Sequence, residues 1–179
     1  MAPTEEQLIA AQGHYFAVVY ARWLSNLFSL RWWAMLFVFI APWFIWWRLV
    51  DKRRTGEILA YGLLVAFLST TLDEAGITLR LWTYTMTLLP LCVQMKPVNV
   101  TLLPVMYMFI YQYFPYWKTY IIAAIIQAAF LAFVGEQFLV WFGIYKMLKW
   151  NHLYSFPIYI AMAVFLKLLT DNLYARRKY

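Results

Sequence analysis

The chain has 179 residues, of which 65% are hydrophobic, 21% are aromatic and only 13% are charged. Soluble domains are typically about half apolar and about a quarter charged, so this composition excludes an ordinary soluble fold and indicates a membrane protein. The net charge of +7 fits anchoring to anionic headgroups, and it predicts membrane lipids as partners. No nucleic-acid partner is needed to explain the charge.

Residues 1–30 are predicted to form an amphipathic helix that lies on the membrane surface. Thr4 and Gln7 have the spacing of a capping box. After them, apolar side chains recur at helical spacing: Leu8, Ala11, Tyr15, Val19, Trp23 and Leu27. This pattern favours an interfacial helix, with a tilted extension of the first span as the alternative. Glu5 and Glu6 stand where a cleavable signal peptide has positive charges, so we expect the segment to remain.

Residues 31–179 are predicted to form a single all-α domain, a bundle of five transmembrane helices. The prediction rests on long stretches with almost no charge, several of them close to the ~20 residues that cross a bilayer as a helix. The spans are predicted near 32–50, 57–78, 97–115, 118–141 and 152–173. A further apolar run, 81–95, is short and contains Pro90, so we expect a re-entrant or surface segment there.

The positions of the cations predict how the chain is oriented in a cell membrane. Alternating loops place three basic groups on one side: Arg48 with Lys52, Arg53 and Arg54; Lys118; and Arg176 with Arg177 and Lys178. By the positive-inside rule this side is cytoplasmic, which predicts an N-terminus outside and a C-terminus in the cytoplasm. The bias is moderate, because the other side also carries cations: Arg22, Arg31, Arg80, Lys96, Lys146 and Lys149.

Three acidic residues inside the predicted spans, Asp73, Glu74 and Glu136, are the strongest signal of function. A carboxylate in hydrocarbon is unfavourable, so such residues normally face protein and mark functional sites. Small residues lead at four-residue steps to both glutamates: Gly62, Ala66 and Thr70 to Glu74, and Ala124, Ala128 and Ala132 to Glu136. Rows of this kind let membrane helices approach closely, so we expect both glutamates to face the protein interior.

Two interpretations of the glutamates stay open at this point. In one, Glu74 and Glu136 converge in the outer leaflet, where they share a proton, hold a cation or bind a cationic group. In the other, each is a structural group paired with Arg80, Lys96 or a threonine. Asp73 is about 100° around the helix from Glu74, so we expect it to face a different neighbour.

Further polar and aromatic residues complete a predicted outward-facing pocket. The ligand-binding candidates are Asp73, Glu74, Arg80, Trp82, Asn99, Tyr107, Tyr111, Glu136, His152 and Tyr154. Two groups among them also have a structural interpretation. His152 fits an interfacial loop histidine, because a histidine without a fixed partner is rarely catalytic. Tyr107 and Tyr111, at helical spacing, fit a packing stripe.

No catalytic or metal-binding motif is evident, and the sequence indicates no cofactor. The lone Cys92 cannot form an internal disulfide, and no histidine or cysteine has metal-ligand spacing. We therefore expect a protein that binds or helps translocate a small polar or cationic ligand or a lipid headgroup. The alternatives are an accessory subunit that docks a membrane protein or a second copy, and an intramembrane lipid enzyme with Glu136 or Glu74 as base and His152 as acid.

Several short motifs, in order along the chain, carry a resemblance to a known family. They are Leu72-Asp73-Glu74, Leu81-Trp82-Thr83-Tyr84, Leu103-Pro104-Val105-Met106-Tyr107, Tyr111-Gln112-Tyr113-Phe114, Phe133-Val134-Gly135-Glu136, Gly143-Ile144-Tyr145 and Tyr154-Ser155-Phe156-Pro157-Ile158-Tyr159. Over residues 30–173 the chain resembles the CBO-type family of small multi-pass membrane proteins from spore-forming Firmicutes.

The resemblance implies a multi-pass bundle in the cytoplasmic or forespore membrane of a sporulating bacterium. It implies no biochemical activity, since none is assigned to that family. The chain departs from the family pattern in two places: Asn99 replaces an expected aspartate, and Gln137 replaces an expected proline. The first change removes a carboxylate and argues against a metal site, and the second is expected to straighten the fourth helix.

Overall fold

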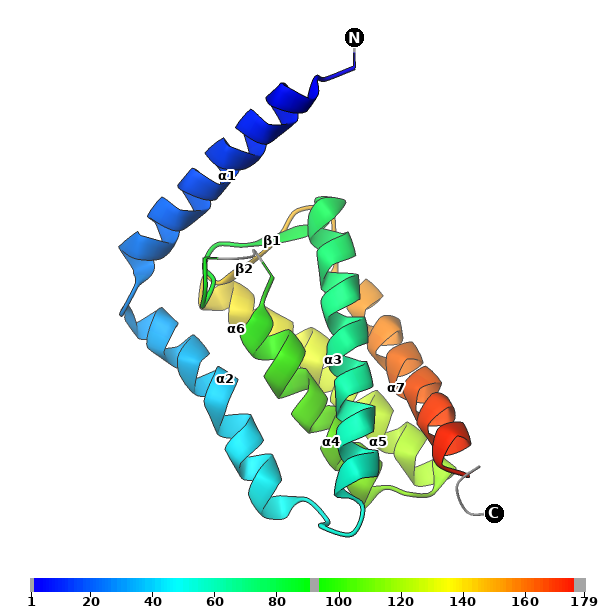
Figure 1. The fold of residues 1–179 in the computed structure, drawn as a ribbon. Coiled ribbons are helices and arrows are strands. Elements are labelled where there is room, and N and C mark those ends of the chain that lie inside the picture. The colour runs from blue at the N-terminus through cyan, green and yellow to red at the C-terminus, as the bar shows by residue number, and fades with distance from the viewer. Residues whose placement is uncertain (1, 91–93, 176–179) are drawn as a thin grey trace.

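The computed structural model describes residues 2–90 and 94–175, which form a mainly helical protein (Figure 1). Its helices are α1 (Glu5–Asn26), α2 (Leu30–Leu49), α3 (Thr55–Thr78), α4 (Leu103–Tyr113), α5 (Trp117–Ala129), α6 (Glu136–Trp141) and α7 (His152–Ala175). Two π-helical turns, η1 (Val98–Leu102) and η2 (Phe130–Gly135), adjoin α4 and α6, and two short strands are β1 (Trp82–Tyr84) and β2 (Tyr145–Met147). The predicted all-α class is confirmed apart from this small sheet.

Four helices are long and apolar enough to cross a membrane: Leu30–Leu49, Thr55–Thr78, Trp117–Trp141 and His152–Tyr174. They indicate a membrane protein, and they overlap the segments predicted near 32–50, 57–78, 118–141 and 152–173. The segment predicted near 97–115 is also helical, but it consists of the five-residue turn η1 and the 11-residue helix α4. Four helices of spanning length are therefore present in the described chain, and the five-span bundle stays a prediction.

Helix α4 is short, but it lies at the centre of the packed bundle (Figure 1). Its side chains Leu103, Val105, Tyr107, Met108 and Tyr111 are buried. They join a core formed mainly with α3, α5 and α7. A chain segment buried in this way can be shorter than the bilayer because protein, rather than lipid, surrounds its ends.

Helix α1 projects away from the bundle, and none of its residues is buried. The predicted capping box is confirmed, since Thr4 and Gln7 each accept a backbone hydrogen bond from the other. α1 and α2 are separate helices that meet at a bend, where Phe28 has a φ of 61° and Ser29 caps α2. A single continuous helix is thus not formed, and the position of α1 on a membrane surface stays a prediction.

The segment after α3 forms a small sheet at one end of the bundle (Figure 1). Strand β1 pairs antiparallel with β2, with Trp82 opposite Met147 and Tyr84 opposite Tyr145. Within the predicted surface segment 81–95, residues 91–93, including Cys92, lie outside the described residues. The described part is a strand and a loop, so no additional span is present there.

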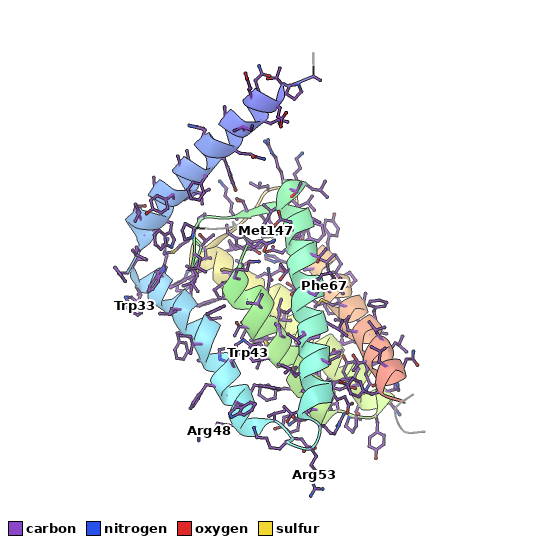
Figure 2. The ribbon with its side chains drawn as sticks, viewed as in Figure 1. Trp33, Trp43, Arg48, Arg53, Phe67 and Met147 are labelled. Carbon is purple, nitrogen blue, oxygen red and sulfur yellow. The ribbon has the colours of Figure 1, made fainter. Side chains whose placement is uncertain are left out.

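The opposite end of the bundle carries the loops that join α2 to α3 and α4 to α5 (Figure 1). Figure 2 shows Arg48 and Arg53 at this end, far from Met147 of the sheet. Arg176, Arg177 and Lys178 lie outside the described residues. The basic loop after α2 therefore shares one end with Lys118, the second residue of α5, as the predicted topology requires.

Candidate functional site

A cavity with a volume of about 240 Å³ lies near the sheet end of the bundle. Its walls come from α3, β1, η1, α6, β2 and α7, so segments far apart in the sequence meet there. Two carboxylates line it, Asp73 and Glu136, with the aromatic side chains Trp82, Tyr84, Tyr145, Trp150 and Tyr159. Aliphatic side chains form much of the remaining wall. Leu72 and Leu79 of the lining are exposed, so the cavity reaches the surface beside α3.

Asp73 is the most extensively hydrogen-bonded residue of this cavity. Its Oδ1 accepts from the Trp82 indole at 2.9 Å and the Tyr84 hydroxyl at 2.8 Å. Its Oδ2 accepts from the Asn99 amide at 2.6 Å and the Met95 backbone N–H at 3.3 Å. Four donors match the approximate acceptor capacity of a carboxylate. Asp73 therefore fixes β1 and η1 against α3 and keeps little capacity for a ligand.

The structure corrects the expected pairing of Glu74 with Glu136. Asp73, rather than Glu74, lines the cavity with Glu136, and Glu74 lines a separate groove between α3 and Val100. The Glu74 side chain is exposed and accepts a hydrogen bond from the Gln94 amide. The two glutamates therefore do not share a site, and the ideas of a shared proton or a shared cation do not apply to them.

Glu74 does not face the cavity because the row of small residues that leads to it turns gradually around the axis of α3. A row of four-residue steps turns by ~40° per step in an α-helix of 3.6 residues per turn, so Gly62 and Glu74 end far apart around the axis. The buried side of α3 instead passes through Ile58, Val65, Ser69 and Asp73. Asp73 does face a different neighbour from Glu74, as expected, but its row, not that of Glu74, is the one that faces the bundle.

The corresponding row before Glu136 does stay buried. Ala124, Ala128 and Ala132 are each at most 2% exposed, and Glu136 is 9% exposed. The π-helical turn η2 lies between Ala129 and Glu136. A π-turn holds more residues per turn than an α-turn, so it offsets the drift of the row. Glu136 therefore reaches the cavity as the small-residue pattern predicted.

Glu136 pairs with His152, which begins α7. The His152 Nδ1 lies 2.8 Å from Glu136 Oε2, and the Tyr159 hydroxyl donates to Oε1 at 2.8 Å. His152 Nε2 lies 3.0 Å from the Gln137 side-chain oxygen. This arrangement needs protons on both ring nitrogens, whereas a 180° rotation of the Gln137 amide would suit a neutral ring. Two acceptor positions of Glu136 are left for a ligand.

Burial controls the ionisation of the two strand tyrosines in the cavity wall. Burial raises the pKa of Tyr84 well above its ordinary value, and the nearby Asp73 carboxylate raises it further. The pKa of Tyr145 is also raised, mainly by burial and then by Glu136 and Asp73. Both phenols therefore keep their protons, and Tyr84 remains a donor to Asp73.

The other predicted residues are placed as follows. Trp82 and Asn99 lie in the cavity wall. Tyr107 is not among the residues that line the cavity, and its hydroxyl donates to the Tyr159 carbonyl at 2.9 Å. Tyr154 is exposed, and its ring contacts Trp150. Arg80 is exposed at the end of α3, with a φ of 55°.

Tyr111 is not part of this site but belongs to a second polar cluster at the opposite end of the bundle. Its hydroxyl contacts Glu57 at 2.7 Å and Asp171 at 3.1 Å. Lys167 pairs with Asp171 at 3.3 Å and is only 3% exposed. Its ammonium nitrogen lies within 5.2 Å of three ring centroids, those of Tyr111, Trp117 and Tyr120. This cluster holds compensating charges of both signs.

Sequence reasoning missed several residues that build the site. Tyr84, Tyr145, Trp150 and Tyr159 line the cavity, although tyrosine and tryptophan near span ends are also typical of interfacial belts. The alternation of Trp82 and Tyr84 along one short strand was the available signal, because both side chains point to the same face. The pairing of β1 with β2 is long-range and had no such signal.

Comparisons with protein-family models, with curated proteins and with solved structures gave no match. The resemblance to the CBO-type family stays a hypothesis that rests on the sequence motifs. Function is therefore argued from the site alone. Chemically, the cavity offers one fully bonded carboxylate, one carboxylate with free acceptor positions, and aromatic walls.

Proposed function

We propose that the cavity binds a small ligand with one positively charged ammonium group and an apolar body, as in a cationic lipid headgroup. The main support is Glu136, a 9% exposed carboxylate with unused acceptor positions in a mostly apolar cavity. A buried carboxylate of this kind is stabilised by a cation. The ammonium group supplies that charge, and the apolar wall accommodates the rest of the ligand.

The aromatic walls support the same ligand class. The rings of Trp82 and Trp150 meet edge to face with their centroids 5.0 Å apart, and the ring centroids of Tyr84 and Tyr145 are 5.4 Å apart. Aromatic faces attract ammonium groups, and clusters of them form cages for quaternary ammonium ligands. A cavity of about 240 Å³ has roughly the liquid volume of eight water molecules, enough for a trimethylammonium head.

An organic cation fits the site better than a metal ion. Over the described ranges of the chain, no group of three histidine, cysteine, aspartate or glutamate side chains is placed to hold a metal. His152 and Tyr159 each contact one carboxylate oxygen of Glu136, and these contacts occupy positions at which a metal ion would bind. The proposed ligand needs only one carboxylate together with the aromatic walls.

Thermal unfolding of the purified protein in detergent tests the proposal. Octyltrimethylammonium should raise the unfolding temperature, and octanol and octanoate should not, because they have the chain without the positive charge. At a ligand concentration about a hundred times Kd, the stabilisation should reach about 2.7 kcal/mol. Glu136→Gln should abolish the response, while the matched variant Glu74→Gln should keep it. Equal responses in wild type and Glu136→Gln would refute the assignment.

An intramembrane enzyme has weaker support. Glu136 and His152 do form an orienting pair, but His152 Nε2 faces Gln137. The nearby Ser155 hydroxyl accepts a hydrogen bond from the Trp150 indole at 2.9 Å. The geometry thus lacks the contact between histidine and serine that would activate a nucleophile.

The exposure of helix α1 supports a second role for the protein, in which this helix binds the membrane surface or a partner. None of its 22 residues is buried, and several large apolar side chains are exposed, including Leu8, Ile9 and Phe16. We propose that this helix lies on the outside surface of the membrane, with the basic loop after α2 and Lys118, at the opposite end of the bundle, on the cytoplasmic side. Single cysteines introduced at Thr55 or Lys149 of a Cys92→Ser variant test the topology: an impermeant reagent added outside should label only the Lys149 position.

A further inference from the structure

We infer that the groove beside α3 is a binding site for phosphatidylethanolamine, a phospholipid whose headgroup carries a primary ammonium group and a phosphate. The groove has a volume of about 890 Å³ and is lined by α3, by Gln94 and Lys96 of the loop before η1, and by Val100. It shares Ala75 and Leu79 with the cavity described above, but no charged residue. The inference therefore concerns a second site and does not rest on the ligand proposed for the cavity.

The groove covers the half of α3 nearest the sheet. Its lining follows the chain from Ala66 to Leu79, a rise of ~20 Å at 1.5 Å per residue. One leaflet contributes ~15 Å of the ~30 Å hydrocarbon core, so the groove is long enough for a headgroup and part of an acyl chain. Figure 2 shows Phe67 about midway along α3. In the proposed topology the groove therefore lies in the outer leaflet, with Glu74 toward the headgroups.

Two opposite charges, Glu74 and Lys96, lie at the outer end of the groove. The Gln94 side chain stands between them: its amide N–H donates to the Glu74 carboxylate, and its amide oxygen accepts from the Lys96 ammonium. Within the described chain no direct ion pair joins these two charges. Two hydrogen bonds of ~2.9 Å and the width of one amide group keep the charged atoms at most about 8 Å apart.

The loop that carries Gln94 and Lys96 is fixed against α3 from two sides. Asp73 accepts from the Met95 backbone N–H at 3.3 Å on the inner side, and the neighbouring Glu74 bonds Gln94 on the outer side. Gln94 is only 8% exposed. A site whose side chains are already held in place loses less conformational entropy on binding. The two charges are therefore in position before a ligand arrives.

Both charged groups keep most of their hydrogen-bonding capacity. Glu74 has one described hydrogen bond of the about four that a carboxylate accepts, and Lys96 has one of the three that an ammonium donates. A carboxylate at the edge of the hydrocarbon normally has a charged or polar partner. An ethanolamine headgroup has an ammonium group for Glu74 and, two carbons away, a phosphate for Lys96. It therefore complements both charges at once.

The groove lining favours a primary ammonium group over the trimethylammonium of choline. A primary ammonium has three N–H donors for a carboxylate, whereas trimethylammonium has none and is recognised by clusters of aromatic faces. Phe67 is the aromatic side chain of the groove lining. It lies seven residues from Glu74, ~10 Å deeper along α3. The groove therefore lacks the aromatic cage that the cavity has.

The deeper part of the groove matches the rest of a phospholipid. Ala66 and Thr70, from the row of small residues that leads to Glu74, leave room beside α3, and Phe67, 72% exposed, offers an apolar contact to an acyl chain. The Thr70 hydroxyl is buried without a hydrogen-bond partner among the described residues. Its rotation about the Cα–Cβ bond breaks no hydrogen bond and turns it toward the groove. There, one turn below Glu74, it can donate to an ester carbonyl of the lipid.

Native mass spectrometry of the purified protein in detergent tests this inference. Phosphatidylethanolamine, phosphatidylcholine and phosphatidylglycerol with identical acyl chains are added, and the Kd of each is measured. Wild type should bind phosphatidylethanolamine about tenfold more tightly than the other two, the effect expected of hydrogen bonds to a charged group. Glu74→Gln should remove this preference, because the amide has no charge. Glu136→Gln, the same change made in the cavity, should keep it.

Lys96→Met provides a different readout. It should weaken the binding of all three lipids by a similar factor, because all three carry the phosphate, and the preference for ethanolamine should remain. Lys149→Met is the matched control, since Lys149 is exposed and does not line the groove. Circular dichroism checks that each variant is folded.

Three results would overturn the site. Equal Kd values for the three lipids in wild type would indicate ordinary annular lipid. An unchanged preference in folded Glu74→Gln would show that Glu74 does not bind the ammonium group. A preference that is lost in Glu136→Gln but kept in Glu74→Gln would place the lipid in the cavity. The response to octyltrimethylammonium is measured separately, so either proposal can fail while the other stands.

Discussion

At the cavity end of the bundle, Asp73 and Glu136 are hydrogen-bonded to neutral donors and one histidine, whereas at the opposite end Glu57 and Asp171 each lie within 3.3 Å of a cation, Arg54 or Lys167. The second arrangement is compensated within the chain itself. The first depends on dipoles, on the His152 ring and on whatever enters the cavity. An acid that lacks a permanent cationic partner is the feature that distinguishes a ligand site from a structural network.

Asp73→Ala should give the largest loss of stability. It leaves four donors, those of Trp82, Tyr84, Asn99 and Met95, without their acceptor. Each unpaired buried donor is unfavourable, and because such losses are not additive we expect about 4 kcal/mol in total. Chemical unfolding in mixed micelles measures the change. The neighbouring variant Glu74→Ala, on the exposed side of α3, should stay within about 0.5 kcal/mol. A loss below about 1 kcal/mol for Asp73→Ala would contradict its anchoring role.

Lys167→Met tests the compensated end and should be the next most damaging. It removes the ion pair to Asp171 and the contacts with three aromatic rings. We expect a loss of about 3 kcal/mol, because a carboxylate is left without its cation. Adding Asp171→Asn should restore part of this loss, since it removes the uncompensated charge. Strictly additive effects in this double-mutant cycle would show that the two side chains are not coupled.

Gly76→Ala tests how the cavity wall is packed. A Cβ atom at Gly76 would lie 2.0 Å from the Trp82 ring, so the indole that donates to Asp73 has to move. Overpacking of this kind should destabilise the protein by about 2 kcal/mol and weaken octyltrimethylammonium binding. Gly56→Ala is the matched control, because a Cβ there meets no atom within 4 Å. Unchanged ligand binding in Gly76→Ala would show that Trp82 does not shape the site.

Arg54→Gln should have the smallest effect. Its ion pair with Glu57, at 2.9 Å, joins two residues that are three positions apart in the sequence, and it is partly exposed. Such pairs contribute about 0.5 kcal/mol, and salt screens them. Unfolding at low and high salt should give a small difference that shrinks as the salt concentration rises. A loss above about 2 kcal/mol would mean that Arg54 supports the buried cluster directly.

Composition and hydropathy were enough to predict the membrane-protein class, because they depend only on which residues are present. The capping box at Thr4 was also predictable, since its partners are three residues apart. Which of Asp73 and Glu74 lines the cavity was not predictable from the sequence. It depends on the rotation of α3 about its axis, and a row of four-residue steps extrapolates that rotation wrongly over three steps.

The aromatic cavity wall and the Lys167 cluster lay beyond sequence reasoning for another reason. Both are assembled from residues more than 40 positions apart, such as Trp82 with Trp150 and Tyr120 with Lys167. A local pattern contains no record of such contacts. Glu136 was found because its signal, a row of alanines, is local and because η2 keeps that row in phase.

The π-helical turn η2 determines what the deletion of a single residue would do to the site. One such turn is equivalent to an α-helix with a single residue inserted, so deleting one residue between Phe130 and Gly135 would restore regular α-helical winding. The helix would keep nearly its whole length and hydropathy, yet everything after the deletion would turn by about 100° relative to the residues before it. Insertion in the membrane would survive such a deletion, while the Glu136 carboxylate would leave the cavity.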